Sequence, residues 1–176
     1  EIQRRLAISP KKEVMLYVHG FNETFATSAF TAAELCHFFG REQVCSFFTW
    51  PASSTGNFLI SYTTTTESAE YAVDHLKKAL RMIAATPGVE RIQLLAHSRG
   101  TAVLLNALRE LMIEAIAAGM NPADVYRIDN LVLLSLDIDV DIAGQKITGF
   151  VSDPDLTRTW PNDALPRLLN GRLTIY

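Results

Sequence analysis

One serine of the sequence lies in a context suited to nucleophilic catalysis. Ser98 is part of the run Leu-Leu-Ala-His-Ser-Arg-Gly at 94–100, where an apolar segment ends and a segment of helical period begins. In a sharp turn from strand to helix, a serine side chain projects from the carboxyl edge of the sheet, and small residues two positions before and after it let the helix and strand cross closely. Ala96 and Gly100 occupy these positions. The sequence therefore predicts Ser98 as a nucleophile.

The alternative for Ser98 is a structural role, in which its side chain caps the helix that begins near Gly100. A capping serine requires neither His97 before it nor small residues on both sides. These neighbours favour the nucleophile.

The run His19-Gly20-Phe21-Asn22 follows the first apolar segment and predicts the second half of the site. In folds with such a serine turn, this loop gives one backbone N–H to an oxyanion hole, and the residue after the nucleophile gives the other. The two donors are then Phe21 and Arg99, and Gly20 allows close approach of the backbone.

The histidines do not supply an evident general base. His19 and His97 stand where loop-shaping residues are expected, while His37 and His75 lie in helical segments as surface or packing residues. In hydrolases that have such a serine turn, the nucleophile, the acid and the histidine of the catalytic triad follow one another in this order along the chain. No histidine follows Ser98, although an imidazole or an equivalent group must take the serine proton.

Apolar and amphipathic segments alternate and predict how the loops are positioned. The apolar runs are residues 14–18, 44–50, 92–96 and 131–136; the segments of helical period are residues 24–39, 67–85 and 101–118. Continuous apolar runs are typical of strands buried on both faces of a parallel sheet. The alternation predicts a single α/β domain over residues 1–176 with a doubly wound, mostly parallel sheet and helices on both faces. Together with the serine turn, this makes the expected fold α/β-hydrolase-like.

The two ends of the chain are less regular. Residues 1–12 are expected to form an N-terminal extension, and residues 144–163 are rich in Gly, Pro and Asp. A short helix is predicted at 164–169 and a last strand at 172–176.

Composition excludes several classes of function. A net charge of −3 over 176 residues, with scattered Lys and Arg, argues against nucleic acid as a partner. No apolar run approaches the roughly 20 residues that span a bilayer, and no signal-peptide pattern is present. Because the chain starts at Glu1 without Met, we expect a mature form or an excised piece. Neither the compartment nor the oligomeric state can be read from the sequence.

Cys36 and Cys45 are too few for a disulfide framework and do not suggest a zinc site. We expect both to be free buried thiols. A disulfide between them is the alternative.

Two further groups of residues are candidates for the site. Asp137, Asp139 and Asp141 follow the fourth apolar run at metal-ligand spacing, but without the glycine and distal glutamate of a calcium loop. We therefore predict no metal; one carboxylate caps the next segment or orients the site, and Asp137 is the candidate acid. Trp50 and Tyr62 are candidates for an apolar substrate pocket, with simple packing as the alternative.

Several motifs together resemble a known family. They are Tyr-Val-His-Gly-Phe-Asn at 17–22, Phe-Thr-Trp-Pro at 48–51, Tyr62 with Glu-Ser-Ala at 67–69, the serine run, and Leu-Asp-Ile-Asp-Val-Asp at 136–141. In order and spacing they resemble the bacterial α/β-hydrolase family of unknown function DUF900, from about residue 14 to residue 176. The resemblance implies a serine-hydrolase triad with Ser98 as nucleophile and no established substrate. Relatives more often carry Met at Arg99 and Asp at Thr65, so the substrate-facing wall is expected to differ.

In that family an acidic loop directly follows the last strand, and the histidine comes later. We therefore expect a chain truncated at its C-terminus, with the triad acid and histidine beyond Tyr176. The predicted function is a serine hydrolase of a small carboxylic ester or similar acyl compound, without a cofactor. Two alternatives stay open: a non-catalytic binding domain on the same scaffold, and an acyltransferase that uses the same serine.

Overall fold

The computed structural model describes residues 1–52, 58–148 and 167–176. In chain order its elements are α1 (Ile2–Ile8), β1 (Glu13–Val18), α2 (Phe25–Phe38), β2 (Val44–Phe48), α3 (Phe58–Ala84), β3 (Arg91–His97), α4 (Arg99–Ala117), α5 (Pro122–Tyr126), β4 (Ile128–Leu134), α6 (Val140–Thr148) and β5 (Leu173–Ile175). The predicted alternation of strands and helices is confirmed.

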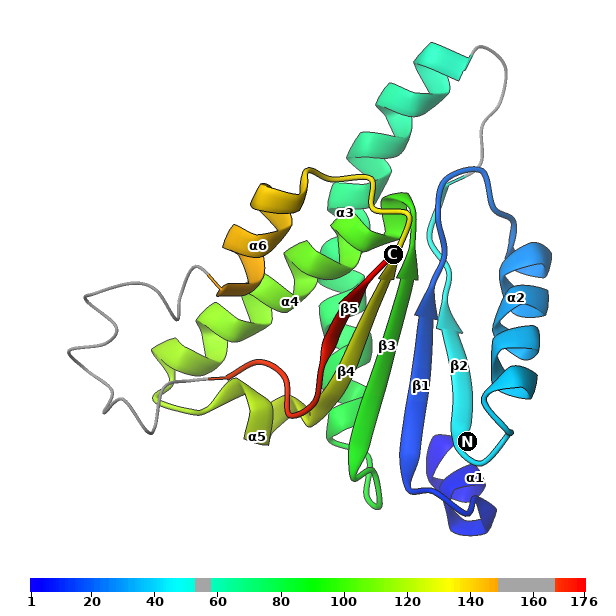
Figure 1. Ribbon diagram of the computed structural model, residues 1–176, viewed down its shortest axis with the longest axis vertical. Helices are drawn as coiled ribbons and strands as arrows, with labels where there is room; N and C mark the ends of the chain where they lie inside the picture. Colours follow the sequence, from blue (N-terminus) through cyan, green and yellow to red (C-terminus); the bar gives the residue numbers. More distant parts are fainter. Residues whose placement is uncertain (53–57, 149–166) are drawn as a thin grey trace.

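The strands form one parallel sheet in the order β2-β1-β3-β4-β5 (Figure 1). The interior strand β1 explains the continuous apolar run at 14–18, because these side chains are at most 3% exposed and both faces of the strand are covered. Val18 pairs with Ala96. The loops that follow β1 and β3 therefore leave the same edge of the sheet side by side.

Helices cover the sheet from both sides. On one face α2 packs over a cluster that contains Met15, Tyr17, Ala32 and Leu95. On the other face α3 and α4 pack over the larger core, as Figure 1 shows. The winding thus reverses between β1 and β3, and the crevice at such a switch point is where open α/β sheets bind ligands.

A buried lysine fastens α3 to α4. The Lys77 side chain is only 10% exposed, and its Nζ lies 2.6 Å from Glu110 Oε2 and 2.7 Å from Glu114 Oε1. Hydrogen bonds to these two carboxylates raise the pKa of Lys77. These ion pairs therefore join α3 to α4, the helix that follows the serine turn.

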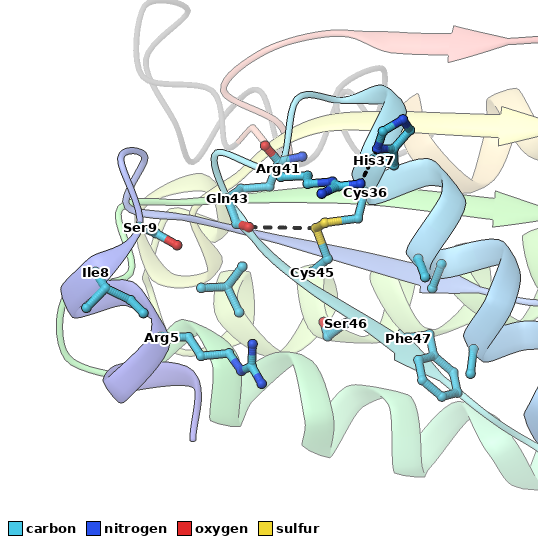
Figure 2. Close-up of a pocket in the computed structure, with 14 residues that line it drawn as sticks. Arg5, Ile8, Ser9, Cys36, His37, Arg41, Gln43, Cys45, Ser46 and Phe47 are labelled. Atoms are coloured by element: carbon cyan, nitrogen blue, oxygen red, sulfur yellow. Dashed lines mark hydrogen bonds between the residues drawn. A yellow bond between two sulfur atoms is a disulfide. The ribbon is translucent and has the colours of Figure 1, made fainter.

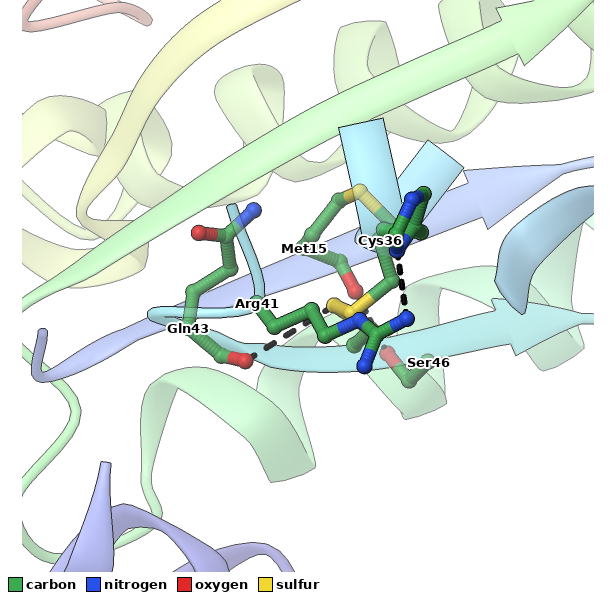
Figure 3. Close-up of a disulfide and its surroundings, with 7 residues drawn as sticks. Met15, Cys36, Arg41, Gln43 and Ser46 are labelled. Carbon is green, nitrogen blue, oxygen red and sulfur yellow. Dashed lines mark hydrogen bonds between the residues drawn. A yellow bond between two sulfur atoms is a disulfide. The ribbon is translucent and has the colours of Figure 1, made fainter. Parts of the chain in front are cut away.

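Cys36 and Cys45 are joined by a disulfide (Figure 3). The preferred expectation of free thiols was wrong, because the end of α2 lies beside the start of β2 and brings the two Cα atoms to 6.0 Å, within bridging distance. The bridge borders a cavity of about 560 Å³ between α1, α2 and β2, shown in Figure 2.

Several element boundaries differ from the predicted ones. The helices α1 and α5 were not predicted, and α3 begins at Phe58 rather than at 67, so the helix includes the threonine tract despite its weak helix propensity. Helix α6 occupies the first part of the stretch at 144–163, where a loop was expected.

The helix predicted at 164–169 was wrong where it can be checked, because residues 167–169 are not helical. Arg167 instead accepts a hydrogen bond from Ala123 N at 2.8 Å and donates its N–H to Asn121 Oδ1 at 3.1 Å, which ties its backbone to α5. The rest of that segment, residues 164–166, lies outside the described residues.

Among the helices of the described ranges, none has the length and apolarity to cross a membrane.

Candidate active site

Ser98 lies alone between the end of β3 and the start of α4, in a backbone conformation that few non-glycine residues adopt. Its φ is 50° and its ψ is −128°, which is outside the allowed regions for an ordinary side chain. Such strain persists only where the surrounding structure enforces it, and it is concentrated at functional sites. Here Ser98 N donates to Leu134 O at 2.9 Å, and Ser98 O accepts from Thr101 N at 2.9 Å and Thr101 Oγ1 at 2.6 Å.

The capping alternative for Ser98 is not what the structure shows. Ser98 stands at the N-cap position of α4, but its side chain makes no capping hydrogen bond to the helix. The residue is partly exposed. Its hydroxyl is therefore not used to cap the helix.

Two glycines allow the serine turn and the loop after β1 to touch. A Cβ on Gly100 would lie 2.4 Å from His19 O and 2.7 Å from Val18 O, so only glycine fits where α4 crosses the end of β1. A Cβ on Gly20 would lie 2.9 Å from Ser98 Cβ. The predicted neighbourhood of the two loops is thus observed at contact distance.

His19 is locked in one tautomer beneath its loop. Trp50 N donates to His19 Nε2 at 3.1 Å, so the proton is on Nδ1, which donates to Gly20 O at 2.9 Å. Trp50 Nε1 donates to His19 O at 2.9 Å, and the two rings stack with centroids 5.6 Å apart. Burial lowers the pKa of His19. A neutral imidazole with both nitrogens engaged does not serve as a base.

The other histidines also stand apart from the serine hydroxyl. His97 Nδ1 lies 3.7 Å from Glu23 Oε1, on the side of the loop after β1. His37 bonds to Arg41 at the end of α2, and His75 packs beside Tyr71 on α3. In the described part of the chain, therefore, no histidine hydrogen-bonds to Ser98.

The backbone around Phe21 is held from both sides. Gly20 N donates to Glu23 Oε1 at 3.2 Å, and Asn22 N donates to Ala52 O at 2.7 Å. The first bond fixes the His19–Gly20 peptide and the second fixes the Phe21–Asn22 peptide, so the Gly20–Phe21 peptide that carries the Phe21 N–H lies between two fixed ones. Arg99, the other predicted donor, is the first residue of α4, where helical N–H groups and the helix dipole favour negative charge.

The Arg99 side chain adds a feature that the serine motif does not predict. It is 10% exposed; its Nη2 donates to Thr66 Oγ1 at 2.5 Å, and its Nη1 lies 3.7 Å from Asp137 Oδ2. These residues border a polar cavity of about 130 Å³ that Glu70 and Asn106 also line.

The aspartates after β4 divide into two roles. Asp139 Oδ1 accepts from Asp141 N at 2.8 Å and Ile142 N at 3.3 Å, so it caps α6, as predicted for one of the three carboxylates. Asp137 instead lies at the first turn of α4, where its N–H donates to Thr101 Oγ1 at 3.4 Å. Its role as catalytic acid stays a prediction.

Of the two predicted pocket residues, the structure describes the side chain of Trp50 but not that of Tyr62. Trp50 is 5% exposed and packs on His19, which matches the packing alternative; a contact with substrate stays a prediction. Tyr62 belongs to the first turns of α3, and its side chain lies outside the described residues. Glu23, which bonds to the loop after β1, was missed because its contact with His97 is made only by the fold.

Comparisons with known proteins place the chain in a family. A family model described as "alpha/beta hydrolase of unknown function (DUF900)" matches residues 1–174. Among solved structures, the chain is similar to a lipase-esterase related protein from Clostridium acetobutylicum ATCC 824, with 14% identity and a TM-score of 0.41 over 86% of this chain and 59% of that one.

It is also similar to the siderophore hydrolase EstB from Aspergillus fumigatus, with 21% identity and a TM-score of 0.37 over 72% of this chain and 36% of that one. The chain thus spans less than two thirds of either neighbour. A search of curated proteins gave no match. The match over 1–174 confirms both the resemblance and the fold class that the sequence predicted: the chain belongs to the α/β-hydrolase family of unknown function DUF900.

Proposed function

We propose that this protein is a serine hydrolase of a carboxylic ester or similar acyl compound, with Ser98 as its nucleophile. The observation that carries the proposal is the backbone of Ser98, held at φ 50° and ψ −128° against Gly20. A fold that stabilises such strain at a serine whose hydroxyl does not cap its helix has a use for the side chain at that place.

In the proposed reaction, Ser98 Oγ loses its proton to a general base as it bonds to the carbonyl carbon of the substrate. The carbonyl oxygen takes the electron pair, and the N–H groups of Phe21 and Arg99 stabilise its charge, at about 3 kcal/mol per donor. Collapse of the tetrahedral intermediate breaks the bond to the alkoxide leaving group, which takes the proton from the base. Water then releases the acyl group from Ser98 by the same two steps.

The base in this proposal is not one of the four histidines of the sequence, given the contacts of His19 and His97 described above. We propose that residues beyond Tyr176 supply the imidazole and its acid. The second candidate for the acid is Asp137, which lies in the segment directly after β4.

The test is covalent labelling of the full-length gene product with a fluorophosphonate probe. Wild-type protein should be labelled at Ser98, and Ser98→Ala should not be labelled. Ser135→Ala is a matched control, because Ser135 also follows a strand with a positive φ of 49°; it should be labelled like wild type. Labelling that survives Ser98→Ala would contradict the proposal, and a wild-type protein that does not react would favour a non-catalytic binding domain.

A further inference from the structure

Glu23 is a partly buried carboxylate directly before α2, and capping does not explain it. Thr24 is the N-cap of α2, and its hydroxyl and that of Thr27 form a complete capping box. The Glu23 side chain is nevertheless only 19% exposed. A carboxylate loses solvation in such a place and needs other hydrogen-bond donors to compensate.

Those donors come from three parts of the fold. Glu23 Oε1 accepts from Gly20 N at 3.2 Å and from Tyr17 Oη at 3.4 Å, and Glu23 Oε2 accepts from Ser28 Oγ at 3.3 Å. Burial raises the pKa of Tyr17, so its phenol stays a donor. The carboxylate therefore ties the loop after β1 both to its own strand and to the first turn of α2.

The same carboxylate also faces the serine turn. His97 Nδ1 lies 3.7 Å from Glu23 Oε1, and His97 directly precedes Ser98. A Cβ on Gly20 would lie 3.1 Å from that same Nδ1. Glu23 thus stands against both segments that carry the proposed oxyanion donors: Gly20 precedes Phe21, and His97 is two residues before Arg99.

We infer that Glu23 is a positioning residue that sets the orientation of the loop after β1 relative to the serine turn, and with it the geometry of the oxyanion hole. This inference rests on the proposed function. Glu23 does not touch the reacting atoms; it acts through the Gly20 amide, whose hydrogen bond fixes the His19–Gly20 peptide, directly before the Gly20–Phe21 peptide that carries the Phe21 N–H. Donors in an oxyanion hole stabilise charge only when they are held in place before the reaction.

Positioning of the loop requires an acceptor oxygen at Glu23 but not a negative charge. The charge itself would not help the reaction, because it would repel the negative charge of the oxyanion. Glu23→Gln keeps an oxygen for Gly20 N–H and an amide for Ser28 Oγ. Glu23→Ala removes both. Glu23→Asp withdraws the carboxylate from Gly20 by one methylene. The three variants therefore separate geometry from charge.

The experiment uses the full-length protein, hydrolysis of p-nitrophenyl acetate, and inhibition by a trifluoromethyl ketone, whose adduct carries the oxyanion. For Glu23→Ala we expect kcat to fall about tenfold and the inhibition constant to rise about tenfold, with KM changed less than about twofold. Glu23→Gln should stay within about threefold of wild type, and Glu23→Asp should lie between the two. Glu34→Ala, which removes an exposed glutamate of the same helix, should match wild type.

Unchanged kcat and inhibition constant in folded Glu23→Ala would overturn the inference, as would a change confined to KM. If Glu23→Ala does not fold, Glu23→Asp decides the question by the same measurements. Hydrolysis that depends on Ser98 but not on Glu23 would overturn this inference alone. Hydrolysis that survives Ser98→Ala would overturn the proposed function, and the inference with it.

Discussion

The two ends of the sheet are fastened by different means. At the carboxyl edge, glycines let the loop after β1 lie against the serine turn, and hydrogen bonds of Gly20 and His19 hold that loop in place. Near the opposite edge, a disulfide ties the end of α2 to the start of β2. The first arrangement fixes the positions of individual atoms, whereas the second lowers the conformational entropy of the unfolded chain. The comparison suggests that the disulfide contributes to stability and the glycine contacts to the geometry of the site.

The largest expected effect is that of Gly100→Ala. The added Cβ would meet backbone oxygens of Val18 and His19 at 2.7 Å and 2.4 Å, and backbone cannot move aside cheaply. We expect a loss of about 3 kcal/mol in the free energy of unfolding, together with loss of fluorophosphonate labelling. Urea unfolding and labelling of the same sample measure both.

The control for that substitution is Gly88→Ala, where a Cβ meets nothing within 4 Å but φ is +88°. It should cost about 1 kcal/mol from backbone conformation alone and leave labelling intact. Equal costs at both glycines would mean that crowding at the serine turn is unimportant.

The next effect is that of opening the disulfide. In the double variant Cys36→Ser/Cys45→Ser, the unfolded chain regains the freedom of a nine-residue separation, and we expect a loss of about 2.5 kcal/mol in the free energy of unfolding. The rate of Ser98 labelling should stay at the wild-type value. Wild-type protein under reductant should unfold like the variant. A drop in labelling rate without a loss of stability would reverse the roles assigned to the two edges.

The smallest expected effect is a pH dependence from His19. Burial lowers its pKa below the ordinary value of 6.5, although Gly20 O and Glu23 act in the opposite direction. The unfolded chain then takes up this proton at a higher pH than the folded chain does. This part of the stability is complete above about pH 7 and is lost as the pH falls below 6.5 toward the folded-state pKa.

Unfolding by urea at several pH values between about 7 and 5 measures this contribution. His19→Gln, which cannot take up a proton in this range, should lack it, so the difference between variant and wild type should shrink as the pH falls. A constant difference across that range would show that His19 keeps an ordinary pKa.

The serine turn could be predicted because its signals are local. Small residues around Ser98 and the glycine after His19 follow from the close crossing of strand and helix, and buried parallel strands follow from continuous apolar runs. The sequence therefore predicted that the loop after β1 and the serine turn lie side by side, even though it did not give the pairing of the strands.

The contacts of Glu23 and Arg99 could not be predicted in this way. Glu23 meets His97, and Arg99 meets Thr66 and Asp137, across separations that no periodicity describes. The disulfide depends on where α2 ends relative to β2, and the ends of elements are the least certain part of a sequence-based prediction. For the contacts of Glu23 and Arg99 and for the disulfide, the sequence did not reveal the direction in which side chains point at the ends of helices and strands.

The pairing of β1 with β3 also bears on how the site comes into being as the chain folds. Glu13 pairs with Arg91, so the two strands close a long loop, and contacts of this kind form slowly because the entropy of loop closure opposes them. Helix α4 is local and needs no such closure. The helix that follows Ser98 can therefore form early, whereas the strained conformation of Ser98 waits for distant segments to meet. A polypeptide still emerging from its ribosome has the residue but not its folded backbone conformation.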